Sequence, residues 1–163
     1  MVELTDPRVA RIVKALQDLP GQELFQYVGD GGERRTIDSA DVNDYLRQLS
    51  GDDFTAKDFR TWAGTVLAAW ALSEFEKIDS KAAARRNITT AVKKVAGQLG
   101  NTPAVCRSSY IHPEILNSYL DGSLLDNLKR EIKATLRDEL NGLSAEEAAV
   151  LVLLLHRLDS PRS

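Results

Sequence analysis

Apolar residues recur every three or four positions along most of this chain, the spacing of one face of an α-helix. Breaks in the pattern coincide with helix caps: Asp6 precedes Pro7, Ser39 begins a second run, and Gly100 ends a later one. The helices predicted in this way span residues 7–19, 40–50 after a cap at Ser39, 80–98, 113–120, 124–140 and 145–158. Residues 24–28 and 34–37, on either side of Gly29–Gly32, predict a small hairpin, so the expected fold class is mainly α with at most a minor β-hairpin.

A further long helix is predicted to begin after Thr55, which forms a variant of the capping box with Asp58. Lys57 and Arg60 lie in its first turns, where the helix dipole repels cations, so this basic pair points to an anion outside the protein. A pair of solvated surface charges is the alternative. The large side chains expected on the buried face of this helix are Phe59, Trp62, Val66, Leu67 and Trp70.

A short polar segment between residues 99 and 113 offers one tyrosine hydroxyl beside an arginine and an asparagine. Thr102 can cap a helix that has Pro103 in its first position, and Pro113 ends that helix just after Tyr110. A tyrosine at such a place is held by packing and is still reachable from outside. Tyr110 is therefore a candidate nucleophile, although spacing alone leaves open that it is an ordinary core residue.

Positive charge is concentrated in one window of a chain whose net charge is −3. Residues 81–110 contain six basic side chains and no Asp or Glu, so the rest of the chain carries −9. A cluster of this kind is typical of a phosphate-binding face, whereas an ordinary solvated face mixes both signs. The six residues are Lys81, Arg85, Arg86, Lys93, Lys94 and Arg107.

The composition is that of one ordinary domain over residues 1–163, with 43% hydrophobic and 28% charged residues. We expect a cytoplasmic protein without a membrane partner, because no apolar run approaches about 20 residues and no signal-peptide pattern is present. The single cysteine, Cys106, fits a reducing compartment and is expected to be a small buried residue. No cofactor is expected, and His112 and His156 are too far apart in sequence to favour a metal site.

The stretches Phe54–Thr65 and Leu99–Pro113 together resemble the catalytic region of the type IB DNA topoisomerases, in the bacterial and poxvirus branch. The resemblance runs from about Leu16 to Pro113, more loosely beyond, and two motifs in the right order carry it. It implies the helical catalytic fold shared with tyrosine recombinases, double-stranded DNA as partner, and a monomer associated with the nucleoid. The implied reaction joins a tyrosine to the 3′ phosphate of a nicked strand, frees the 5′-hydroxyl and needs neither ATP nor a metal.

The same resemblance assigns roles to individual residues. Tyr110 matches the nucleophile and Arg60 the second catalytic arginine. Asn101, nine residues before Tyr110, matches a position that is histidine in poxvirus and nuclear members and asparagine in bacterial ones. Lys57 stands where tyrosine recombinases have a histidine, and a phosphate contact is expected of it. Contacts to the DNA backbone are expected, from the charge of residues 81–110, of Arg85, Arg86, Lys93, Lys94 and Arg107.

Two catalytic positions of the family have no match in this chain. The first arginine and the lysine that protonates the leaving 5′-oxygen lie upstream in the family, and neither Lys14 nor Arg34 fits those motifs. We expect the β-rich N-terminal domain and the lysine hairpin to lie outside residues 1–163, and the chain alone to relax supercoiled DNA weakly or not at all. The alternatives are a tyrosine recombinase and a non-catalytic helical DNA-binding module that keeps the motif as a relic.

Overall fold

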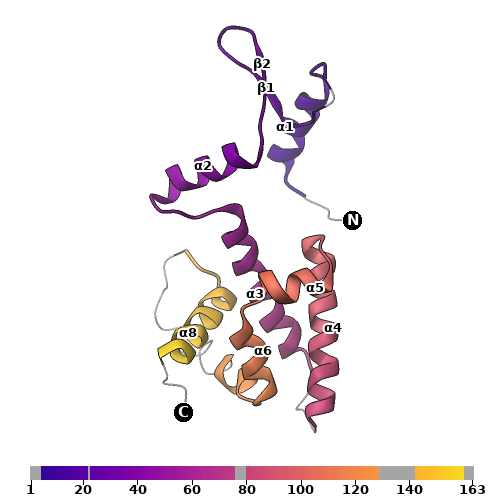
Figure 1. The fold of residues 1–163 in the computed structure, drawn as a ribbon, viewed down its shortest axis with the longest axis vertical. Helices are drawn as coiled ribbons and strands as arrows, with labels where there is room; N and C mark the ends of the chain where they lie inside the picture. The colour runs from indigo at the N-terminus through magenta and orange to yellow at the C-terminus, as the bar shows by residue number, and fades with distance from the viewer. Residues whose placement is uncertain (1–4, 22, 76–79, 129–141, 160–163) are drawn as a thin grey trace. The chain divides into compact units, whose positions relative to one another are not determined.

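The computed structural model describes residues 5–21, 23–75, 80–128 and 142–159. The chain divides into two compact units, residues 1–59 and 60–163, and each is described by itself. The mainly α class with a minor hairpin is confirmed, while the single domain expected over residues 1–163 stays a prediction. The elements in chain order are α1 (Pro7–Gln17), β1 (Gln26–Val28), β2 (Arg34–Thr36), α2 (Ser39–Ser50), α3 (Ala56–Ser73), α4 (Lys81–Leu99), α5 (Pro103–Val105), the π-helix η1 (Cys106–Tyr110), α6 (Pro113–Leu120) and α8 (Ala145–Asp159) (Figure 1).

In the first unit, β1 and β2 form the predicted antiparallel hairpin, with Tyr27 opposite Arg35. The turn closes where the glycines indicated, because Gly29 N donates to Glu33 O at 2.8 Å. Gly32 adopts a φ of 80°, a left-handed conformation that favours glycine. The strands are three residues each, shorter than the apolar stretches suggested.

The first helix begins as predicted and the second does not. Asp6 Oδ1 accepts from the backbone N–H groups that open α1. At α2 the cap is Asp38 rather than Ser39, because the Asp38 carboxylate accepts from Asp41 N while Asp41 Oδ2 accepts from Asp38 N at 2.9 Å. This reciprocal capping box satisfies two backbone donors, which explains why the helix starts at Ser39 instead of after it. Neither α1 nor α2 buries a residue.

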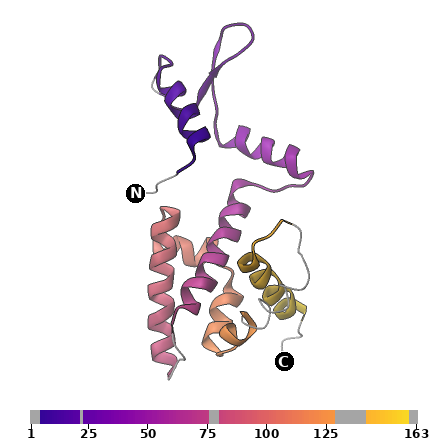
Figure 2. The same cartoon turned by 180° about the vertical axis from the view of Figure 1, so that it is seen from behind.

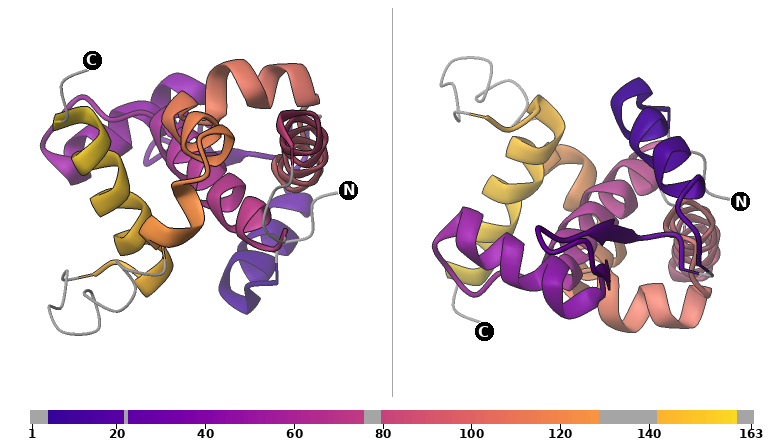
Figure 3. Two further views of the ribbon diagram at one scale, coloured as in Figure 1. Left: turned by 90° about the horizontal axis from the view of Figure 1, so that it is seen from below. Right: turned by 90° about the horizontal axis from the view of Figure 1, so that it is seen from above.

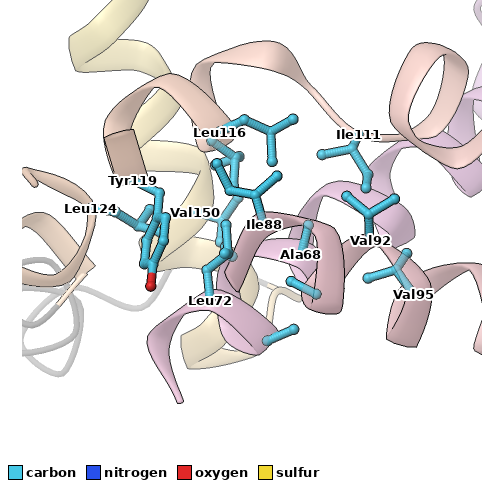
Figure 4. Close-up of a cluster of buried hydrophobic side chains, with 14 of the residues drawn as sticks. Ala68, Leu72, Ile88, Val92, Val95, Ile111, Leu116, Tyr119, Leu124 and Val150 are labelled. Carbon is cyan, nitrogen blue, oxygen red and sulfur yellow. The ribbon is translucent and has the colours of Figure 1, made fainter. Parts of the chain in front are cut away.

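The hydrophobic core lies in the second unit. In Figures 1, 2 and 3, α3 and α6 lie between α4 on one side and α8 on the other. Side chains from these four helices meet in one cluster (Figure 4). Labelled in that view are Ala68, Leu72, Ile88, Val92, Val95, Ile111, Leu116, Tyr119, Leu124 and Val150.

The buried face of α3 differs from the one expected. Its buried residues are small or medium: Gly64, Thr65, Ala68, Ala69, Ala71 and Leu72. Phe59 is 53% exposed, and Trp62, Val66 and Leu67 lie partly buried at the edge of the core. The large residues predicted that their own face of the helix would be buried. The neighbouring face carries small side chains, which let other backbones approach closely, and this is the face that packs into the core.

Polar contacts tie α8 to the helices beneath it. Trp62 Nε1 on α3 donates to Glu147 Oε1 at 3.1 Å, and Glu147 also accepts from Ser144 N at 3.0 Å. Ser144 Oγ accepts in turn from Glu147 N, so the residue that precedes the predicted helix is part of a complete capping box. At the other end of α8, Arg157 pairs with Asp121, which follows α6. The last helix is thereby fixed at both ends.

Two further expectations concern the later part of the chain. Residues 124–128 are helical, and the remainder of the helix predicted over 124–140 lies outside the described residues. In the part of the chain that the structure describes, no helix has the length and apolar character to span a membrane.

Candidate active site

The tyrosine segment is helical but changes its pitch before it reaches Tyr110. Thr102 caps α5 by accepting from Val105 N at 3.3 Å, with Pro103 in the first position, as the sequence predicts. From Cys106 the helix widens into the π-helical turn η1, which ends at Tyr110, and Ile111 is extended. Turns of this type are rare and occur frequently at functional sites. Figure 3 shows this segment running across the end of α4.

Three residues of α3 hold the backbone around Tyr110. Thr61 Oγ1 donates to Ser109 O at 3.3 Å, and His112 N donates to Thr65 Oγ1 at 3.0 Å. Between these two contacts the Tyr110 carbonyl approaches Gly64 so closely that a Cβ there would lie 2.4 Å from its oxygen. No chemical motif singles out these three α3 residues in the sequence, although their spacing places them on one face of a helix.

The Arg60 guanidinium lies over the Tyr110 ring, with 5.0 Å between its Cζ atom and the ring centroid. This distance is typical of a cation–π contact. The same guanidinium donates from Nη2 to the carbonyl oxygen of Leu99, at 2.8 Å. Two partners therefore fix the orientation of Arg60 against the tyrosine ring.

Asn101 donates to the same carbonyl oxygen. Its Nδ2 donates to Leu99 O at 3.2 Å, and its backbone N donates to Ala96 O at 2.9 Å. Gly100 makes this return possible, since its φ of 66° turns the chain at the end of α4. Donors from Arg60 and Asn101 thus meet at one oxygen atom, and Arg60 covers the Tyr110 ring.

The structure brings together three of the four residues predicted to be catalytic: Tyr110, Arg60 and Asn101. The fourth, Lys57, belongs to the first unit and lies exposed in the first turn of α3. Hydrogen bonds from Thr55, and to a smaller extent the charge of Lys57, lower the pKa of the Asp58 carboxyl.

Cys106 has the structural role expected of it, and His112 also has a structural role. Cys106 is completely buried. Burial raises the pKa of its thiol, and the Arg60 charge opposes that effect only in part, so the thiol stays protonated at neutral pH. His112 caps α6, because its Nδ1 accepts from Glu114 N at 3.3 Å.

Basic side chains cover the solvent side of α4. Lys81, Arg85, Arg86 and Lys93 are exposed, and Arg107 is exposed on η1. Lys94 differs from them, because its Nζ lies 2.7 Å from each carboxylate oxygen of Glu74. Part of the predicted positive charge is therefore neutralised within the protein.

Two comparisons with known proteins agree with this arrangement. A family model described as the catalytic core of eukaryotic DNA topoisomerase I matches residues 1–154. The chain is also similar to DNA topoisomerase 1B of Acanthamoeba polyphaga mimivirus, with 33% identity over 145 residues, which cover 78% of this chain and 43% of the relative. The chain thus spans less than half the length of that relative. Since the relative is viral, the bacterial origin expected from the sequence stays a prediction.

Proposed function

This chain belongs to the type IB DNA topoisomerases, and on that premise we propose that it carries the strand-cleaving chemistry of an ATP-independent DNA topoisomerase. In the proposed reaction the Tyr110 oxygen attacks a phosphorus atom of double-stranded DNA. The new O–P bond replaces the bond to the 5′-oxygen, the phenolic proton passes to water, and the 5′-oxygen takes up a proton as it departs and becomes the free 5′-hydroxyl. Reversal of these steps after the strand has swivelled relaxes supercoils. Bond energy is kept in the phosphotyrosine, so ATP is not required.

One observation carries the proposal: the donors of Arg60 and Asn101 meet at a single oxygen atom, beside the ring of Tyr110. Negative charge builds up on the non-bridging phosphate oxygens during in-line attack, and fixed donors are the main means of stabilising it. A guanidinium offers five N–H groups in a planar fork that suits two phosphate oxygens. The carboxamide adds an uncharged donor, and removing one donor of this kind costs about 3 kcal/mol of barrier.

Binding of the DNA backbone is assigned to the basic residues outside the site. Arg107 stands three residues before Tyr110, and the exposed cations of α4 precede it in the chain. We assign phosphate contacts to Arg85, Arg86, Lys93, Lys94 and Arg107, with Lys57 as a further contact. Each neutralised phosphate releases counterions, so affinity is expected to fall steeply with salt.

The proton for the leaving 5′-oxygen is assigned to a lysine outside these 163 residues. An expelled alkoxide is a poor leaving group, and general-acid assistance is worth about 10²–10⁴ in rate. We therefore expect weak relaxation of supercoiled DNA by this chain alone. In the cell we expect a monomer that works in the cytoplasm on nucleoid DNA.

The decisive experiment removes the need for that proton. A DNA duplex with sulfur in place of the bridging 5′-oxygen, within randomised flanking sequence, releases a thiolate that leaves without protonation. The purified chain is expected to form a covalent DNA adduct that survives denaturing electrophoresis and maps to Tyr110, with Tyr110→Phe as the control. DNA binding without an adduct would favour the non-catalytic module, and an adduct formed only by a tetramer would favour a recombinase.

A further inference from the structure

The contacts between α3 and the tyrosine turn point to residues that position the nucleophile without touching DNA. We propose that Thr61, Gly64 and Thr65, here called the α3 seat, are positioning residues for Tyr110. The inference rests on the proposed function, since it gives a catalytic role to the close contact between the Tyr110 backbone and α3.

Gly64 sets how closely the turn can approach. A Cβ at this position would lie 2.4 Å from the Tyr110 carbonyl oxygen, 3.2 Å from its carbonyl carbon and 3.2 Å from its Cβ, whereas ordinary contact begins at 3.4 Å. The obstacle is backbone, which has no flexible end that can move aside. Any side chain at residue 64 must therefore lift Tyr110 by about 1 Å, and a displacement of that size can cost about 10²-fold in rate.

Thr65 fixes the register of the same turn. Its buried hydroxyl donates to Thr61 O at 2.7 Å and accepts from His112 N at 3.0 Å. His112 N comes directly after the extended residue that ends η1. Without the Thr65 hydroxyl, this backbone donor loses the partner that holds it against α3. Thr61 adds a hydrogen bond to Ser109 O on the other side of Tyr110.

The π-helical pitch of η1 agrees with this view. Residues in a widened turn give up regular i to i−4 bonds, and such a turn persists only where the surroundings hold it. The seat supplies contacts at residues 109, 110 and 112, on both sides of the tyrosine. The seat therefore fixes the position of the Tyr110 backbone, and with it the position of the ring that lies under Arg60.

The chain offers matched controls for each part of the seat. Gly64→Ala inserts the obstructing methyl group, and Gly97→Ala makes the same change inside α4, where nothing lies within 4 Å of the new Cβ. Thr65→Val removes the hydroxyl at constant shape, and Thr65→Ser keeps it. Each variant is measured for its cleavage rate on the sulfur-substituted duplex, its DNA affinity, and hydrogen exchange of the His112 amide.

We expect Gly64→Ala to cleave about 10²-fold more slowly and Thr65→Val about tenfold more slowly, with DNA affinity unchanged within about threefold. In both variants the His112 amide should exchange faster, and Gly97→Ala and Thr65→Ser should match the parent chain in every measurement. Because the cleavage rate falls while DNA affinity holds, and Thr65→Ser restores the rate, this pattern separates positioning of Tyr110 from a loss of DNA binding. If Gly64→Ala fails to fold, the two Thr65 variants decide alone.

Unchanged cleavage rates in Thr65→Val and in a folded Gly64→Ala, beside an active parent chain, would overturn the seat and leave the proposed function intact. A parent chain that forms no adduct with the sulfur-substituted duplex would instead remove the proposed function. The seat would then lose its catalytic purpose, whatever the exchange of the His112 amide shows.

Discussion

Arg60 and Asn101 donate hydrogen bonds to the same acceptor, the carbonyl oxygen of Leu99, at 2.8 Å and 3.2 Å. The two side chains come from positions 41 residues apart in the sequence. The Leu99 carbonyl at the end of α4 therefore holds both donors in one place. Preorganised donors of this kind act on a transition state without a reorganisation penalty.

Replacing Arg60 by lysine tests the planar fork. Lys keeps the charge but has neither the paired N–H groups nor the flat surface that covers the Tyr110 ring. We expect Arg60→Lys to slow adduct formation on the sulfur-substituted duplex by about 10²-fold while DNA affinity changes less than about threefold. Arg11→Lys on α1 is the control. Equal rates for Arg60→Lys and the parent chain would remove Arg60 from the catalytic set.

Asn101 predicts a characteristic pH dependence. A carboxamide donates without being protonated, whereas histidine carries its extra charge only below a pKa of about 6.5. We therefore expect the rate of Asn101→His, divided by that of the parent chain, to decrease as the pH rises through about 6.5. Taking the ratio cancels the ionisation of Tyr110, which both proteins share. A ratio that is flat between pH 5 and pH 8 would contradict this role.

The contact between Trp62 and Glu147 predicts an acid-sensitive contribution to stability. Hydrogen bonds from Ser144 N, and then from Trp62, lower the pKa of the Glu147 carboxyl. A lowered folded-state pKa stabilises the protein fully above the unfolded value, near 4.3, and this stabilisation is lost as the pH falls through the folded value. Urea unfolding of Glu147→Gln should show a deficit of about 1 kcal/mol at pH 7 that shrinks towards pH 3. Glu146→Gln, its exposed neighbour, should show a smaller deficit.

The buried hydroxyl of Tyr119 predicts a stability difference between two tyrosines. Tyr119 is 1% exposed, and its hydroxyl accepts from Asn87 Nδ2 at 2.8 Å, which joins α4 to α6. Tyr119→Phe leaves that amide without its partner and should lower the free energy of unfolding by about 1–3 kcal/mol. Tyr45→Phe, at a side chain on α2 that is 59% exposed, should change it by less than about 0.5 kcal/mol. Denaturant titration measures both, and equal effects would contradict the assignment.

Lys93 and Lys94 are neighbours on α4 that predict different effects on DNA binding. Both side chains are exposed, but Lys94 forms an ion pair with Glu74 at 2.7 Å. We expect Lys93→Ala to reduce the slope of log affinity against log salt by about 0.9, and Lys94→Ala to reduce it by clearly less. Glu74→Gln should strengthen binding, because it releases the positive charge of Lys94. Equal slopes for the two lysine variants would indicate that the ion pair opens on DNA.

Local chemistry made most helix boundaries predictable. Asp6 with Pro7, Thr102 with Pro103, and Gly100 each act through backbone groups within a few residues, and the structure has them where the pattern indicated. The error at Ser39 is also local. Two adjacent residues could each cap the helix, and only Asp38 has an acidic residue three positions later to complete the capping box.

The features that escaped prediction depend on distant partners. The widened turn before Tyr110 is held by α3, and the close approach at Gly64 follows from tertiary packing, which a helical pattern does not encode. The packed stripe of α3 escaped for a related reason, since large residues dominate a hydrophobic pattern whereas small ones permit close contact. For the site, a family resemblance named Tyr110, Arg60 and Asn101, and no sequence pattern indicated that Leu99 would supply their shared acceptor.

The complete burial of Cys106 gives this protein a built-in reporter. It is the only cysteine of the chain, so the folded protein should resist thiol-reactive dyes. A cysteine introduced on the surface can then be labelled selectively for fluorescence without first removing the native one. The rate at which a thiol reagent modifies Cys106 would report how often the turn that carries the tyrosine opens. A ligand that holds this turn closed would lower that rate.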